Sequence, residues 1–305
     1  MKIIVTGATG FVGARLTRAL LDSGHAVHAL ARKRPANLPA SVAFSEWRST
    51  EAEPPSESLA GADAVIHLAG EQVAQRWTPE VKKRIYSSRV DGTRHLVNAL
   101  STESHRPQVL ICASAIGFYG SRGDEVLTET SSPGDDFLAL LVIDWEKAAM
   151  LAESLGIRVV RLRFGVVLGK DGGALAKMLP PFRLGVGGRL GNGRQWTSWI
   201  HIDDVINLIL FTLANSGVHG PVNATAPEPV TNAEFTRELA ALVHRPAIFP
   251  VPTLALKLLF GEMAGMVLAG QRVIPEAAKV AGFEFQYPKL GPALRRLVSE
   301  GSGPQ

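Results

Sequence analysis

The chain has 305 residues, of which 46% are hydrophobic and 20% are charged, with a formal net charge of +4 and an isoelectric point near 9.3. This length allows one large domain or two modest ones, with enough apolar material for a core. The basic residues are scattered and form no cluster interleaved with aromatic residues, so the composition argues against a nucleic-acid-binding protein.

Cysteine usage and apolar stretches indicate the compartment. The single cysteine, Cys112, excludes an internal disulfide framework and favours a reducing compartment, which we take to be the cytoplasm. Residues 1–5 enter a strand at once, so we expect no signal peptide. The most apolar later stretch, residues 252–268, is interrupted by Lys257 and Glu262, which favours a buried helix over a membrane span.

Apolar runs alternate with helically spaced segments along the first half of the chain. Short apolar runs predict strands at residues 2–6, 26–30, 64–68, 109–113 and 157–162. Helical spacing predicts helices over residues 10–23 and about 144–155. This alternation predicts an α/β fold, a Rossmann-type doubly wound parallel sheet covered on both faces.

The second half of the chain has a different pattern. Residues 170–199 are glycine-rich with little periodicity, which predicts a mobile loop region. A helix is expected over residues 203–215 and a short strand over 221–224, and from about residue 227 the chain reads as helices joined by proline-rich segments. We therefore expect a Rossmann domain of residues 1–169, to which residues 200–226 return. Residues 170–199 and 227–305 would form a smaller, mostly helical substrate-side lobe.

The motif Gly7-Ala8-Thr9-Gly10-Phe11-Val12-Gly13 lies directly after the first predicted strand and before the first predicted helix. Gly7 permits the tight turn, Gly10 lets the backbone approach a pyrophosphate, and Gly13 lets the helix pack on the sheet. The N-terminus of the helix then offers free N–H groups to the anion. The motif predicts a dinucleotide-binding site.

The end of the second predicted strand distinguishes NAD from NADP. An NAD site usually places an acidic residue there to bind the ribose hydroxyl. Here the chain reads Ala31-Arg32-Lys33-Arg34, without an acid. Arg32 can hold a 2′-phosphate through forked, charge-assisted hydrogen bonds, and the alternative is an ordinary solvated basic loop. We expect NADP(H) as the cofactor, with Arg32 as its main specificity contact.

Several segments together resemble a known superfamily. The glycine motif, residues 63–70 (DAVIHLAG) and residues 114–120 (SAIGFYG) are spaced as in the extended short-chain dehydrogenase/reductase superfamily. Residues 199–204 (WIHIDD) and 270–275 (GQRVIP) resemble one branch, the NAD(P)-binding "epimerase family" proteins of unsettled function. Some of these are described as oxidoreductases or cell-division inhibitors. The resemblance runs from residue 1 to about residue 298.

The resemblance implies a set of cofactor contacts that adds to the glycines and Arg32. These positions are the remaining residues of the glycine motif, the end of the second strand and the segment after the third strand, namely Thr9, Phe11, Val12, Ala31, Leu68, Ala69 and Gly70.

The chain departs from the superfamily at the residues that move protons. Those enzymes use a Ser, a Tyr, and a Lys four residues after the Tyr that lowers the Tyr pKa. No tyrosine of this chain has a lysine four residues later, and the superfamily spacing counted from Ser114 places Leu138 and Val142 there. The superfamily Ser falls on Ser114 or Ala115. The remaining catalytic candidates are Ser114 and Tyr119, although Tyr119 equally suits a packed turn.

A charged residue falls on the apolar face of the helix that we expect to begin at Pro79, with Thr78 as its N-cap. Arg89 lies on this inward stripe, and a buried charge is costly unless it is paired. Its partner is either a cofactor phosphate, as the resemblance implies, or an internal carboxylate such as Asp63 or Glu71. Arg84, about one turn earlier, is a further candidate contact.

Arg163 ends the fifth predicted strand, at the carboxyl edge where such sheets bind ligands. The resemblance implies a cofactor contact at this position, but Arg161 lies on the same strand face and leaves the assignment open. Glu146 and Lys147 lie near the missing pair but out of register, and we expect them on a solvated helix face.

Two functions from different classes fit these observations. The first is an NADP-dependent oxidoreductase or nucleotide-sugar-epimerase-like protein that uses Ser114, Tyr119 or a bound water in place of the missing pair. The second is a non-catalytic NADPH-binding sensor or scaffold. We expect no metal site, because the His and acidic residues lack ligand spacing. The expected partner is a small-molecule substrate of unknown identity, without nucleic acid or membrane, and a homodimer is considered.

Overall fold

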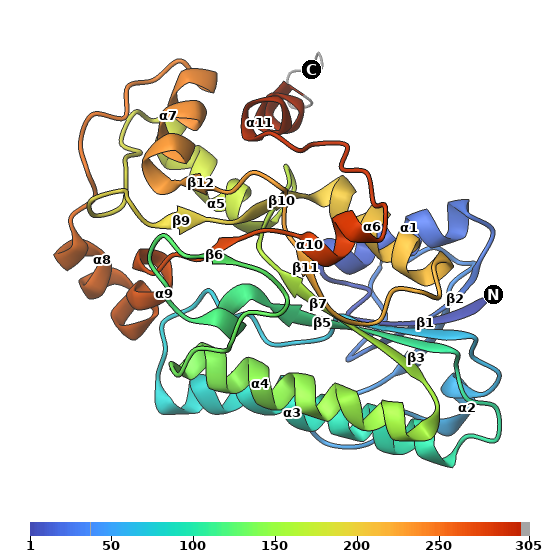
Figure 1. The fold of residues 1–305 in the computed structure, drawn as a ribbon. Helices are drawn as coiled ribbons and strands as arrows, with labels where there is room; N and C mark the ends of the chain where they lie inside the picture. The colour runs from blue at the N-terminus through green and yellow to red at the C-terminus, as the bar shows by residue number, and fades with distance from the viewer. Residues whose placement is uncertain (37, 300–305) are drawn as a thin grey trace.

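The computed structural model describes residues 1–36 and 38–299. Seven parallel strands form one sheet in the order β11-β7-β5-β4-β1-β2-β3 (Figure 1). Their bounds are β1 Lys2–Thr6, β2 Ala26–Ala31, β3 Ala43–Glu46, β4 Ala64–His67, β5 Val109–Ala115, β7 Arg158–Phe164 and β11 Gly220–Ala224. The Rossmann-type prediction is confirmed, and only β3 was not expected.

Helices cover both faces of the sheet (Figure 1). On one face α3 (Pro79–Thr102) packs beside α4 (Phe137–Met150), with the short helices α2 (Ser56–Leu59) and η2 (Leu151–Leu155) nearby. The other face carries α1 (Phe11–Asp22), α6 (Ile202–Ala214) and α10 (Glu276–Val280). Both layers bury apolar side chains against the strands, which is the arrangement that makes such parallel sheets stable.

The remaining elements build a smaller, largely helical part above the carboxyl ends of the strands. Its helices are α5 (Gly173–Arg183), α7 (Asn232–Leu242), α8 (Thr253–Phe260), η3 (Gly261–Met263), α9 (Ala264–Leu268) and α11 (Leu290–Ser299). Three two-stranded sheets accompany them, pairing β10 (Trp199–His201) with β8 (Val166–Leu168), β12 (Val230–Thr231) with β9 (Trp196–Thr197), and β13 (Arg272–Val273) with β6 (Val126–Leu127). The prediction of a mostly helical C-terminal region is confirmed.

Two sequence-based expectations are corrected. The helix expected over residues 144–155 begins at Phe137, where the Asp136 side chain accepts a hydrogen bond from the Ala139 amide. The region expected to be a loop contains α5, whose buried Leu175, Leu179 and Phe182 follow helical spacing. Pro180 and Pro181 lie inside α5 and, with the surrounding glycines, obscured its pattern.

Two glycines explain how the first strand meets the first helix. Gly7 has a φ of +69°, and a Cβ there would lie 2.7 Å from the Leu68 carbonyl carbon at the end of β4. A Cβ at Gly13 would overlap the Gly7 carbonyl oxygen and lie 2.8 Å from the Ala8 Cα atom. Both positions therefore require glycine, as the motif predicted. Within the described ranges, no helix is long and apolar enough to cross a bilayer.

Candidate functional site

The glycine loop presents its backbone at the carboxyl end of β1. Gly10 is the N-cap of α1, and no side chain caps the first amides of this helix. A Cβ at Gly10 would approach only the Gly7 carbonyl oxygen, at 3.3 Å. The Phe11 ring is turned away, because a Cβ at Gly169 or Gly172 would overlap it. The amides at the start of α1 therefore remain available to an anion.

A small cavity of about 80 Å³ opens between α1 and the turn after β2. It is lined by residues from the glycine loop, α1 and the turn, namely Ala8, Thr9, Ala14, Thr17, Arg18, Pro35, Leu38 and Pro39. Arg32 is exposed beside this region, at the end of β2, and no hydrogen bond or ion pair to another described residue engages it. Arg18 also lines this cavity, and nothing in the sequence singled it out. Its position two helical turns after Phe11 places it on α1, the helix that follows the glycine loop.

A buried hydrogen-bonded chain fixes the end of β4. The Thr6 hydroxyl accepts from the Leu68 and Ala69 amides and lies 2.7 Å from His67 Nδ1, so its proton goes to that nitrogen. The Thr93 hydroxyl donates to the Arg89 carbonyl and lies 3.1 Å from His67 Nε2, which must therefore carry the ring proton. Burial lowers the pKa of His67 to about 4, so the ring stays neutral.

Arg89 lies next to this turn as an incompletely paired cation. A Cβ at Gly70 would lie 3.2 Å from the Arg89 guanidinium carbon. The guanidinium donates one hydrogen bond to the Ile85 carbonyl at 3.3 Å and lies 5.2 Å from the centre of the Trp145 ring. Its pKa is lowered to about 10 by burial, and the charge of Glu71 opposes this shift.

The two internal partners considered for Arg89 do not form an ion pair with it. Asp63 accepts from the Lys2 backbone amide at 2.6 Å, and no described carboxylate lies within the 4.0 Å ion-pair distance of Arg89. Arg84 is exposed on the same helix.

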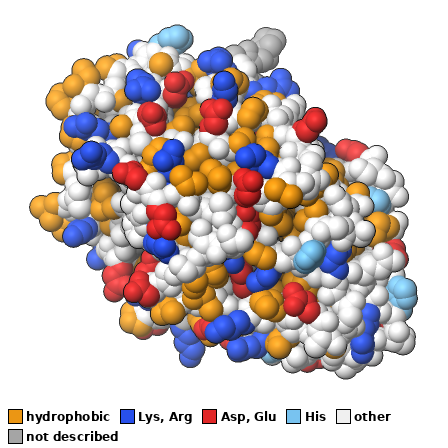
Figure 2. Space-filling model, viewed as in Figure 1, with side chains coloured by type: hydrophobic (Ala, Val, Ile, Leu, Met, Phe, Trp, Pro, Cys, Tyr) orange, Lys and Arg blue, Asp and Glu red, His pale blue; other side chains and the backbone are white. Residues whose placement is uncertain are grey.

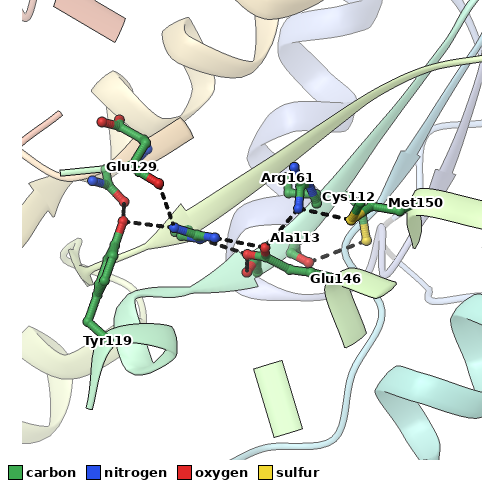
Figure 3. Close-up of polar contacts among 10 residues, drawn as sticks. Cys112, Ala113, Tyr119, Glu129, Glu146, Met150 and Arg161 are labelled. Atoms are coloured by element: carbon green, nitrogen blue, oxygen red, sulfur yellow. Dashed lines mark hydrogen bonds and ion pairs between the residues drawn. The ribbon is translucent and has the colours of Figure 1, made fainter. Parts of the chain in front are cut away.

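Glu146 of α4 is the centre of a buried polar network (Figure 3). Its carboxylate accepts from Arg163 Nε at 2.7 Å and Nη2 at 2.9 Å, from Arg161 Nη1 at 3.1 Å, and from the Ser114 hydroxyl at 2.6 Å. The register of the sheet explains this convergence. Ser114 on β5 pairs with Arg163 on β7, and alternate residues of a strand share a face, so both arginines point at α4.

The network continues to the short helix η1 (Ile116–Tyr119), which follows β5. Arg163 Nη1 donates to the Tyr119 hydroxyl at 3.0 Å, and that hydroxyl donates to the Asn223 side-chain oxygen at 2.7 Å (Figure 3). The Asn223 amide nitrogen donates to the Ile274 carbonyl at 3.0 Å, and its backbone amide to Glu129 at 2.9 Å. Burial raises the pKa of Tyr119, with the positive charge of Arg163 acting against this rise.

This network revises the predicted roles of several residues. Glu146 is 4% exposed and paired, so the expectation of a solvated position was wrong, although Lys147 is exposed as expected. Ser114 and Tyr119 are 3% and 0% exposed, with both hydroxyls engaged in the network, which argues against direct contact with a substrate. Arg163 is 3% exposed, and its guanidinium donates to Glu146 and Tyr119 in this structure. The cofactor contact expected at this position stays a prediction.

Leu138 and Val142, which the count from Ser114 assigns to the superfamily Tyr and Lys, lie on α4 beside η1. A Cβ at Gly117 would lie 3.4 Å from the Leu138 Cβ atom, so Leu138 packs against the turn that follows β5. Val142, one turn later, is buried. The two positions are thus filled by apolar packing, and no proton transfer can involve them.

The tail segment that marks the branch in the sequence packs against β9 and the residue that follows it. A Cβ at Gly270 would overlap the Trp196 backbone nitrogen, and the Arg272 guanidinium lies 4.4 Å from the centre of the Trp196 ring. The Ser198 hydroxyl donates to the Gln271 carbonyl at 2.6 Å and accepts from the Val273 amide at 2.9 Å. This explains why the segment carries a small residue and a cation at these two positions.

The chain belongs to the NAD dependent epimerase/dehydratase family, whose model matches residues 3–224. A second match, to a domain of unknown function (DUF1731), covers residues 251–297. These matches confirm the resemblance seen in the sequence.

Full-length relatives support this membership. The chain is 43% identical to the chloroplastic epimerase family protein SDR39U1 homolog of Arabidopsis thaliana, covering 98% of this chain and 87% of the relative. It is 40% identical to the epimerase family protein YfhF of Bacillus subtilis, covering 98% and 99% of the two chains.

Solved structures agree with the fold. The crystal structure of the human epimerase family protein SDR39U1 with NADPH has a TM-score of 0.89 at 35% identity and covers 98% of this chain and 99% of that chain. A nucleoside-diphosphate sugar epimerase from Corynebacterium glutamicum has a TM-score of 0.80 at 36% identity, covering 98% of this chain and 58% of that chain. A Bacillus cereus UDP-glucuronic acid 4-epimerase, at 19% identity and a TM-score of 0.79, shares the fold.

Replacing Glu146 tests the buried network. We expect Glu146→Gln to lower the free energy of unfolding by about 3–5 kcal/mol, because the buried Arg163 guanidinium and the partly buried Arg161 guanidinium lose their counter-charge. Chemical denaturation measures this change. The matched control is Lys147→Ala, since Lys147 is the next residue of α4 and its side chain is 70% exposed, and it should change stability by less than about 0.5 kcal/mol. Equal effects of the two substitutions would contradict the network.

Proposed function

We propose that this chain is an NADP(H)-binding protein of the short-chain dehydrogenase/reductase type. The observation that carries the proposal is Arg89, a partly buried cation beside Gly70 without an ion-pair partner among the described residues. Such a charge is costly in the interior unless an anion accompanies it. A dinucleotide pyrophosphate on the glycine loop would supply that anion, and the human relative was crystallised with NADPH.

The other predicted contacts fit the same ligand. The amides of Phe11 and Val12 would receive the pyrophosphate at the start of α1, and Arg32 would receive the 2′-phosphate. The backbone from Leu68 to Gly70 would border the cofactor. The Thr6 hydroxyl, which also bonds to His67, fixes this backbone by accepting from the Leu68 and Ala69 amides. We propose residues 1–169 and 200–226 as the cofactor-binding domain, and the cytoplasm as the compartment.

The chemistry beyond binding follows from the side chains at the end of β5. A bound dihydronicotinamide supplies a hydride. The positions where the superfamily would place a proton donor are Ser114, Tyr119, Leu138 and Val142. The hydroxyls of Ser114 and Tyr119 are engaged in the buried network. Leu138 and Val142 are apolar and have no proton to donate. The geometry therefore favours an NADPH-binding sensor or scaffold over an enzyme that uses the superfamily's proton relay.

The second candidate is an oxidoreductase that takes its proton from water, which membership of the epimerase/dehydratase family favours. A spectrophotometric assay of NADPH oxidation with a panel of carbonyl compounds separates the two. The sensor proposal predicts no oxidation above the rate without protein. Turnover that persists in Ser114→Ala and Tyr119→Phe would instead establish the oxidoreductase with water as proton source. Turnover that is lost in both variants would show that the Ser114 and Tyr119 hydroxyls take part in the reaction.

Replacing Arg32 tests the cofactor assignment. We expect Arg32→Ala to weaken NADPH binding about 10- to 100-fold, because a hydrogen bond to a charged group contributes about 1.5–3 kcal/mol. NADH lacks the 2′-phosphate, so its affinity should change less than about twofold by the same argument. Isothermal titration with both nucleotides measures this. The control Arg94→Ala removes an exposed arginine of α3 that pairs with Asp91 and should change neither affinity. Wild-type protein that prefers NADH would overturn the assignment.

A further inference from the structure

Seven large apolar side chains are exposed on one part of the C-terminal region. They are Leu184, Val186, Ile248, Phe249, Leu254, Leu258 and Leu259, with exposed fractions from 66% to 80%. Helix α8 buries only Leu256 among its eight residues. A soluble monomer rarely exposes so many large apolar groups together, and such clusters mark interaction sites. We call these seven residues the apolar surface.

The residues of the apolar surface come from three segments that lie side by side. The segment that holds Leu184 and Val186 continues into residues 189–191, which pair with Val251: the Val251 amide donates to the Arg189 carbonyl at 2.8 Å, and the Gly191 amide donates to the Val251 carbonyl at 3.0 Å. A Cβ at Gly188 would overlap the Phe249 carbonyl oxygen. Helix α8 begins two residues after Val251 (Figure 1). The three segments that carry the exposed side chains therefore lie next to one another.

The charge of these segments is of one sign. Residues 183–191 and 244–260 contain four cations, Arg183, Arg189, Arg245 and Lys257, and no Asp or Glu. All four are exposed, and Arg245 Nε donates to the Arg183 carbonyl at 3.3 Å. The next acid in the sequence, Glu262, forms an ion pair with Lys82. Figure 2 shows hydrophobic side chains with Lys and Arg, and some Asp and Glu, along the margin where Figure 1 places α7 and α8.

We propose that the apolar surface attaches this protein peripherally to an anionic lipid surface. Apolar side chains flanked by cations lie in the interface between headgroups and acyl chains, where anionic lipids attract the cations. A second copy of the chain fits less well, because a two-fold interface would bring the same four cations against each other. A peptide partner would need a groove, whereas side chains exposed by 66–80% project from the surface.

The sequence analysis expected no membrane partner, and this proposal revises that expectation. A peripheral contact needs no spanning helix. The apolar residues of α8 were expected to be buried, and only the structure shows that most of them are not.

Co-sedimentation of the full chain with vesicles tests the proposal. We expect binding to phosphatidylcholine vesicles that contain phosphatidylglycerol, weaker binding at high salt, and little binding to pure phosphatidylcholine. The double variant Arg245→Ala/Lys257→Ala should lower the partition coefficient about 30-fold, at about tenfold per 1.4 kcal/mol and about 1 kcal/mol for each cation. Phe249→Asp and Leu258→Asp should each abolish most of the binding.

The matched control is Val280→Asp, which changes an apolar residue of α10 that is 79% exposed but lies outside the apolar surface. It should bind anionic vesicles as the wild type does. No binding to anionic vesicles, equal binding to neutral ones, or equal losses in Val280→Asp and Phe249→Asp would overturn the proposal. Self-association in analytical ultracentrifugation that Phe249→Asp abolishes would assign the surface to a second copy instead. None of these outcomes depends on whether the chain binds NADPH.

Discussion

The carboxylate of Glu146 fixes how α4 sits on the sheet. Two guanidiniums, from the partly buried Arg161 and the buried Arg163, point from β7 toward this helix, and both are costly there without a counter-charge. Glu146 must therefore face the sheet, which sets the rotation of α4 and brings Leu138 against the turn after β5. Through Arg163 and Tyr119 the same network reaches β11 and the tail at Ile274, so it joins the helix layer, the sheet and the C-terminal segment.

This arrangement separates two properties that usually occur together in the superfamily. The glycine loop, the turn after β4 and Arg89 converge at the carboxyl ends of β1 and β4, where we propose that a dinucleotide binds. Where the proposed function expects proton donors, the Ser114 hydroxyl donates to Glu146 and the Tyr119 hydroxyl donates to Asn223. The proposed function follows from this arrangement: a protein that holds a nucleotide without the side chains that would pass a proton to a substrate.

The sequence predicted those features whose physical cause is local. The glycine motif, six of the seven strands of the large sheet and the Thr78 cap of α3 depend on neighbouring residues, and the structure confirms them. Glu146 was misplaced because its partners on β7 are distant in sequence, so its burial left no local signal. The short, partly exposed strand β3 lacks an apolar run, and the prolines of α5 obscured a helix. The sequence of α8 is apolar and predicts a buried helix, but few other segments pack against it, and this cannot be read from its own residues.

The free energies of unfolding and of NADPH binding of Arg89→Met test the central claim most directly. If Arg89 is kept for a bound phosphate, methionine should leave the cofactor-free protein as stable as the wild type or more so, because an incompletely paired, partly buried charge is replaced by an apolar side chain of similar length. The same variant should bind NADPH at least about tenfold more weakly, as loss of a charged hydrogen bond predicts. A cofactor-free variant destabilised by several kcal/mol that binds NADPH as the wild type does would contradict the account.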